Sequence, residues 1–104
     1  MYENGVVVYV DPDLEDLIPM FLENRHRDVE EIRKLLREGG VEEIRRLSHS
    51  MKGSGGGYGF YEVSEIGRDM EEAANSGDAE KIENLNDRLA KYLSVVEVVV
   101  RGEE

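Results

Sequence analysis

The chain has no cysteine and no tryptophan, and its 104 residues include only two histidines and two prolines. Without cysteine it can form no disulfide, no thiolate metal site and no cysteine nucleophile. The longest apolar runs, Val6–Val10 and Val98–Val100, are far too short to span a bilayer, and no signal peptide opens the chain. We therefore expect a cytoplasmic protein with no membrane segment.

Positive charge is also scarce. There are 13 Lys and Arg residues against 24 Asp and Glu residues, which gives a net charge of −11. A field of this sign repels the phosphates of nucleic acids and of anionic lipids, so neither is expected as a partner. Hydrophobic residues make up 39% of the chain, enough for one amphipathic core at this length. We predict a single domain over residues 1–104, and a monomer.

Apolar residues recur at intervals of three and four in four segments separated by glycine, a periodicity typical of amphipathic helices. The first helix is expected to start near Pro12 with Asp11 as its N-cap, and to end at Gly39. Pro19 predicts either a kink or a short lead-in helix before a long one. The other three helices are expected to begin at Val41, to span about Phe60–Asn75, and to follow the cap residue Asp78.

Four amphipathic helices with short connections pack most simply as an antiparallel up-down bundle, so the predicted fold is all-α. Residues 1–11 form a short N-terminal extension in this prediction. Its segment Gly5–Val10 is expected to be extended, and either to cover the valine-rich C-terminal end or to pair with it as a strand. The apolar stripe of the fourth helix is expected to continue through Val96 and Val100, although a β-branched tail has weak helix propensity.

His49 is the residue of greatest chemical interest, because the helical period places it opposite the apolar stripe of the second helix. Arg45, Lys52, Gly53 and Gly56 share this outer face, which makes the local patch basic. Lys52 and Arg45 lie within one turn of the ring, where either can neutralise an anion built on it. Glycine inside a helix costs roughly 0.5–1 kcal/mol relative to alanine, and at Gly53 it leaves the ring open to another macromolecule. Gly56 likewise leaves the next turn of this face without a side chain.

An exposed imidazole is mostly uncharged at neutral pH, and its free ring nitrogen is a competent nucleophile toward phosphorus. In phosphoryl transfer the protein mainly positions the reactants and neutralises charge, and magnesium usually bridges the phosphoryl oxygens. A small domain without a cofactor of its own can therefore supply one half of the reaction. We expect a partner to supply the other half, including Mg²⁺, and expect Nε2 to be the reacting nitrogen because it projects furthest from the backbone.

The segment His49-Ser50-Met51-Lys52-Gly53-Ser54 resembles the signature of the histidine-containing phosphotransfer (HPt) domain family. The glycine-rich stretch that follows, the helix end at residues 70–74 and the Gly77-Asp78 turn extend the resemblance over about residues 14–96. It implies a four-helix bundle in which His49 accepts a phosphoryl group from the phospho-aspartate of a receiver domain and passes it to another receiver. The receivers would belong to a response regulator or a hybrid histidine kinase. By the same resemblance, Lys52 would steady the phosphate and Gly53 would let the receiver dock.

Other interpretations of these residues are weaker or stay open. His26 is expected to be an ordinary surface histidine, and two distant histidines without His-x-x-x-His or Glu-x-x-His spacing predict no metal site. The glycine run follows Lys52, the reverse of a phosphate-binding loop, and no strand precedes it. Two alternatives remain: a helical interaction module that binds or inhibits a receiver or kinase without being phosphorylated, and a helical fragment of a larger kinase.

Overall fold

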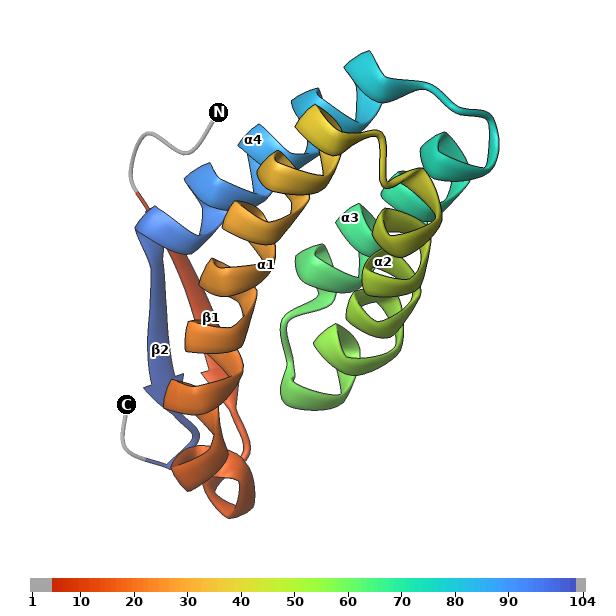
Figure 1. Ribbon diagram of the computed structural model, residues 1–104. Helices are drawn as coiled ribbons and strands as arrows, with labels where there is room; N and C mark the ends of the chain where they lie inside the picture. Colours follow the sequence, from red (N-terminus) through yellow and green to blue (C-terminus); the bar gives the residue numbers. More distant parts are fainter. Residues whose placement is uncertain (1–4, 103–104) are drawn as a thin grey trace.

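The computed structural model describes residues 5–102, which contain four α-helices, two short 3-10 helices and one pair of strands (Figure 1). In chain order the elements are β1 (Val6–Val10), η1 (Pro12–Leu17), α1 (Ile18–Glu38), α2 (Val41–Gly55), η2 (Gly56–Tyr58), α3 (Tyr61–Asn75), α4 (Ala79–Val95) and β2 (Val96–Val100). The predicted four helices are thus confirmed. Among the described residues, no helix is long and apolar enough to cross a membrane.

The first helical segment starts as the sequence predicts. The side chain of Asp11 accepts a hydrogen bond of 2.8 Å from the backbone N–H of Asp13, which caps η1. Pro19 lies in the first turn of α1, where a missing N–H leaves no helical hydrogen bond unmade. The chain therefore has the short lead-in helix rather than a kink.

Glycine and aspartate then set the helix boundaries. Gly39 ends α1 in the left-handed conformation with φ 75°, and Gly77 adopts φ 68° in the turn before α4. The carboxylate of Asp78 accepts a hydrogen bond of 3.1 Å from the backbone N–H of Lys81, so it caps α4 as predicted. α2 and α3 also begin within one residue of their predicted starts.

The prediction of an all-α chain is wrong at its two ends. β1 and β2 form a parallel pair in which Val6 lies opposite Val96 and Val10 opposite Val100. The last two valines of the supposed α4 stripe therefore belong to a strand, because their β-branched side chains pack better on a pleated surface. This confirms that the N-terminal extension pairs with the C-terminal end. Parallel strands need a long crossover connection, which the four helices supply here.

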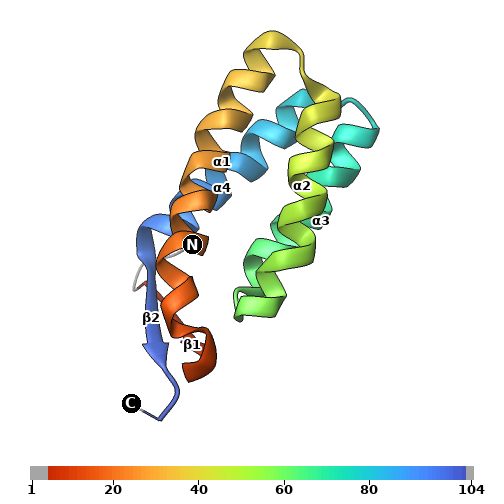
Figure 2. The same cartoon turned by 60° about the horizontal axis from the view of Figure 1, so that its bottom comes forward.

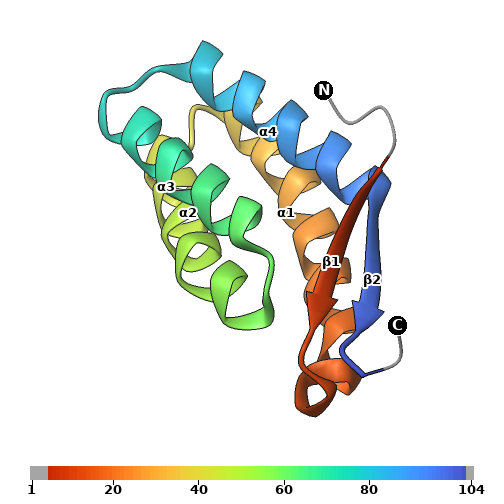
Figure 3. The ribbon, with the colours of Figure 1, turned by 180° about the vertical axis from the view of Figure 1, so that it is seen from behind.

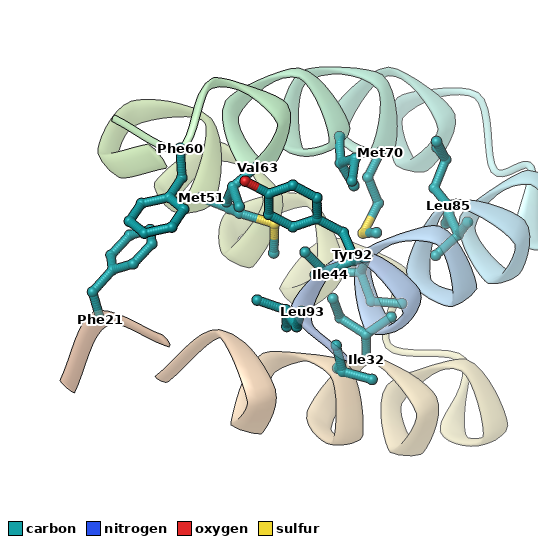
Figure 4. Close-up of a cluster of buried hydrophobic side chains, with 14 of the residues drawn as sticks. Phe21, Ile32, Ile44, Met51, Phe60, Val63, Met70, Leu85, Tyr92 and Leu93 are labelled. Atoms are coloured by element: carbon teal, nitrogen blue, oxygen red, sulfur yellow. The ribbon is translucent and has the colours of Figure 1, made fainter. Parts of the chain in front are cut away.

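The core gathers side chains from every helix, and Figure 4 shows how they converge. The ring of Phe21 stacks on that of Phe60 at 5.1 Å and lies 4.7 Å from that of Tyr58, which joins α1 to the α2–α3 connection. Tyr92 of α4 is buried at the centre. Burial and the negative charge of Glu62 raise the pKa of Tyr92 to about 12. The fully buried side chains include Ile32, Ile44, Met51, Phe60, Val63, Ile66, Met70, Ile82 and Leu89.

α2 and α3 lie side by side along their length (Figure 2). Two buried glycines allow this close approach. A Cβ on Gly67 would stand 2.6 Å from the backbone N of Lys52 and 2.8 Å from the backbone O of Ser48. A Cβ on Gly55 would stand 2.7 Å from the backbone N of Ser64. No side chain fits at such distances, so the absence of side chains at these glycines fixes how α3 lies against the helix that carries His49.

Candidate functional site

His49 lies on the outer face of α2, and 69% of its side chain is exposed. Ile44 and Met51, on the opposite side of the same helix, are fully buried. The predicted presentation of the imidazole to solvent is therefore confirmed. It follows from the helical period, because an amphipathic helix that buries its apolar stripe must turn the opposite face outward.

Glu71 of α3 is the nearest partner of His49, and the sequence analysis missed it. One carboxylate oxygen, Oε2, lies 2.9 Å from Nδ1 of His49, and the other, Oε1, lies 3.5 Å from Nζ of Lys52. Only 15% of the Glu71 side chain is exposed, so it lies beneath the ring and the ammonium group. Burial by itself raises the pKa of Glu71, but the hydrogen bond and charge of His49 and the charge of Lys52 outweigh it, and the pKa is lowered.

This contact selects one tautomer of the ring. An ionised carboxylate can only accept hydrogen bonds, so Nδ1 of His49 must carry the hydrogen that lies between the two groups. In a neutral ring the lone pair is then on Nε2. Nε2 is thus the ring nitrogen that is free to accept a bond from outside the molecule.

The two predicted phosphate-binding cations differ in what they contact. Lys52 is 46% exposed on its side chain and shares Glu71 with His49. Arg45 instead donates to Glu42 on its own helix, with an Nη2–Oε1 distance of 2.6 Å. That hydrogen bond lowers the pKa of Glu42 and raises the pKa of Arg45. With Glu71 and Glu42 beside the cations, the patch around His49 is mixed in charge rather than simply basic, which corrects the sequence prediction.

The two outer glycines also differ. A Cβ on Gly53 would meet nothing within 4 Å, so the space one turn beyond His49 is open, as predicted. Gly56 lies in η2 rather than in α2, and a Cβ there would touch the ring of Tyr61 at 3.5 Å. The predicted clearance at Gly56 is therefore taken up by this chain's own Tyr61, which is itself 74% exposed.

Side chains from both neighbouring helices hold the C-terminal end of α2. The hydroxyl of Ser64 donates to the backbone O of Lys52 at 2.8 Å and accepts from the backbone N–H of Gly56 at 2.7 Å. From α1, Nη1 of Arg25 donates to the hydroxyl of Ser54 at 3.2 Å. α2 changes into η2 just beyond Ser54, so these bonds fasten the one place where its helical ladder is interrupted.

Arg25 is itself held in place within α1. Its Nε donates to Asp28 at 2.8 Å, and its guanidinium lies 4.9 Å from the ring centre of Phe21. Burial raises the pKa of Asp28 although the charge of Arg25 opposes this. His26, on the same helix, is exposed, as expected for a surface histidine. Within the described range, no cluster of three or more His, Asp or Glu residues is placed to hold a metal ion.

The ring of His49, held by Glu71, is exposed on the outer face of α2. The sequence model of the Hpt domain matches residues 16–97, which include α1 to α4 in full. The chain belongs to the Hpt domain family. Hpt domains act in histidine phosphotransfer in two-component phosphorelays, as phosphocarriers that interact with receiver domains. Comparison of this Hpt domain with curated proteins and with solved structures gave no match.

Proposed function

We propose that His49 of this Hpt domain accepts a phosphoryl group at Nε2 from the phospho-aspartate of one receiver domain and passes it to another. The observation that supports this most directly is the contact between Nδ1 of His49 and Glu71, because it leaves the Nε2 lone pair pointing away from the partner carboxylate. The short connections between neighbouring helices support an antiparallel up-down bundle as the frame of this site. The cytoplasm is the proposed compartment.

The transfer step needs little chemistry from this chain. The Nε2 lone pair attacks phosphorus, the P–O bond to the aspartate breaks, and the released carboxylate stays on the receiver. The ring gains positive charge as the P–N bond forms. Glu71 faces the opposite nitrogen, Nδ1, and stabilises that charge. The partner receiver would bring the Mg²⁺ that bridges the phosphoryl oxygens.

Lys52 and Gly53 have separate tasks in this proposal. The ammonium group of Lys52 contacts the same Glu71 carboxylate as the ring of His49. It is within reach of a phosphoryl group on Nε2 and neutralises the phosphoryl oxygens. Gly53 leaves room for the receiver to approach the ring. Arg45 lies at the edge of the docking surface, and Gly56 contributes to it together with the exposed ring of Tyr61.

The test is transfer from a receiver domain that has been phosphorylated with a small-molecule phosphodonor. Wild type should acquire a phosphate that is labile in acid and stable in base, whereas His49→Gln should acquire none and keep the same unfolding curve. His26→Gln is the matched control and should be labelled like wild type. Binding to the receiver without any labelling would support a non-phosphorylated interaction module instead and would overturn the proposal.

A further inference from the structure

β2 is the one strand of the pair whose outer edge has no neighbour among the described elements. The sheet consists of β1 and β2 only, and Figure 3 shows β2 at the outside of the molecule, with α1 behind the strand pair and no helix along the outer edge of β2. The other edge, along β1, is approached by the α2–α3 connection, since a Cβ on Gly59 would stand 3.3 Å from the backbone O of Tyr9. An open strand edge is a template for pairing with another strand.

The register shows which backbone groups face outward. Arg101 donates its backbone N–H to the backbone O of Val10, across the parallel ladder. Successive residues of a strand point their backbone N–H and C=O groups to opposite edges. The N–H and C=O groups of Glu97, Val99 and Arg101 therefore point toward β1. The N–H and C=O of Val98 and Val100 therefore face the open edge.

The side chains alternate in the other direction, between the two faces of the sheet. Val8 and Val10 of β1 are buried, whereas Val7 and Tyr9 are 48% and 49% exposed. Val7 is paired with Glu97 and Tyr9 with Val99. The side chains of Glu97 and Val99 therefore lie on the same outer face of the sheet as those of Val7 and Tyr9. Glu97 and Arg101 are both exposed, and neither forms an ion pair with another described residue. They are opposite charges four residues apart: Glu97 lies in β2, and Arg101 is the first residue after it, where its backbone N–H still bonds to β1.

We propose that β2 pairs antiparallel with β2 of a second copy of this chain, with Val99 on the two-fold axis. In this register Val98 lies opposite Val100 of the second copy, so the outward N–H and C=O groups of these residues bond to each other. Glu97 then lies opposite Arg101 of the second copy, and Arg101 opposite Glu97. Shifting the register by two residues in either direction loses both ion pairs, so the charges select this one. The result is a continuous four-stranded sheet.

The proposed dimer is compatible with the site on α2 and does not depend on the proposed function. β2 lies on the opposite side of the molecule from α2 and α3, so His49 stays open to a partner in both copies (Figure 1). Edge pairing buries little surface, and each copy carries a net charge of −11, so the association is weak and depends on concentration. This proposal replaces the expectation of a monomer, which took no account of a free strand edge.

The test is sedimentation equilibrium of the full chain from about 10 μM to about 1 mM at physiological salt. Wild type should pass from monomer to dimer within this range. Glu97→Arg should weaken the association about tenfold, because both ion pairs become repulsive. Glu38→Arg, at the exposed C-terminal end of α1, changes the net charge equally and should associate at least as well as wild type, since it lowers the overall repulsion.

The charge-swapped double variant, Glu97→Arg with Arg101→Glu, decides the register. It restores both opposite-charge pairs in reverse and should recover the wild-type dissociation constant. Circular dichroism confirms that each variant remains folded. A chain that stays monomeric over the whole range, a Glu97→Arg variant that associates as well as Glu38→Arg, or a double variant no better than the single one would each overturn the proposal.

Discussion

Gly67 of α3 lies directly against the backbone of Lys52 of α2, where a methyl group on Gly67 would come within 2.6 Å of the Lys52 nitrogen. One turn further along α3, Glu71 contacts both His49 and Lys52. The closeness of the two helices at Gly67 is what brings a carboxylate from α3 beneath the ring on α2. The proposed site is therefore built by a helix pair, although His49 itself belongs to α2 alone.

Two glycines near the site should respond to alanine in opposite ways. Gly67→Ala places a Cβ against backbone atoms that cannot move aside, and should lower the free energy of unfolding by about 1–3 kcal/mol. Gly53→Ala meets open space inside α2, and should raise it by about 0.5–1 kcal/mol. Urea denaturation measures both. Equal effects of the two substitutions would show that the packing at Gly67 is looser than described.

A large side chain at position 53 should affect docking more than folding. Gly53→Trp adds its bulk to open space one turn beyond His49, so the unfolding midpoint should change little. Transfer from a phosphorylated receiver should slow by about tenfold or more, because a receiver can no longer approach the ring closely. Rapid-quench kinetics gives the rate. A wild-type rate in this variant would mean that the receiver does not pass over Gly53.

Glu71 should fix the tautomer of His49. In wild type, ¹⁵N NMR of the imidazole should show the hydrogen on Nδ1 of the neutral ring, since the carboxylate accepts from that atom. Glu71→Ala removes the acceptor, so the population with the hydrogen on Nε2 should grow and the transfer rate should fall about tenfold. Glu71→Gln keeps an acceptor oxygen and should retain more of the Nδ1–H form than Glu71→Ala. An unchanged tautomer in Glu71→Ala would refute this role.

The two cations should not be equivalent. Lys52→Met removes the ammonium group beside Glu71 and should slow transfer about tenfold, because the phosphoryl oxygens lose their nearest positive charge in this chain. Arg45→Met should slow it less, since Glu42 already holds the guanidinium in a pair on the surface of α2. The ratio of the two rates under single-turnover conditions is the measurement. A larger loss for Arg45→Met would contradict the geometry.

Glu62 should give stability an identifiable dependence on pH. Burial raises its pKa above the ordinary 4.5, against the opposing charge of Arg88, and Oε2 is buried without a hydrogen bond. Between pH 4.5 and the raised pKa, the folded state therefore keeps a proton on Glu62 that the unfolded chain has released. The stability this contributes is complete below about pH 4.5 and is lost as pH rises through the raised value.

Glu62→Gln isolates this contribution, because every other titrating group is common to both proteins. The free energy of unfolding of wild type, relative to the variant, should increase as pH falls from about 7 to about 4.5. Glu71 has a lowered pKa, so its own contribution has the opposite sign and is lost only at lower pH. A difference that stays flat, or that shrinks toward acid, would contradict the raised pKa of Glu62.

Local rules predicted much of this molecule, because they act over one helical turn. Helix boundaries are set by hydrogen bonds and backbone angles that involve only residues close in the chain, at Asp11, Pro12, Gly39 and Asp78. The exposure of His49 followed in the same way from the period of one helix. The pair between Arg45 and Glu42 was also within reach of such rules, because residues three apart on a helix are neighbours on its surface.

Contacts between elements could not be obtained in this way. Glu71 is 22 residues from His49, and only the packing of α3 on α2 at Gly67 brings the two together. Val96 follows an uninterrupted helical pattern, yet it begins a strand because β1 offers a hydrogen-bonding edge from the far end of the chain. The amino-acid order alone settled the helix boundaries at Asp11, Gly39 and Asp78 and the outward position of His49. The tertiary structure decided which side chains meet, because that depends on how closely two backbones approach.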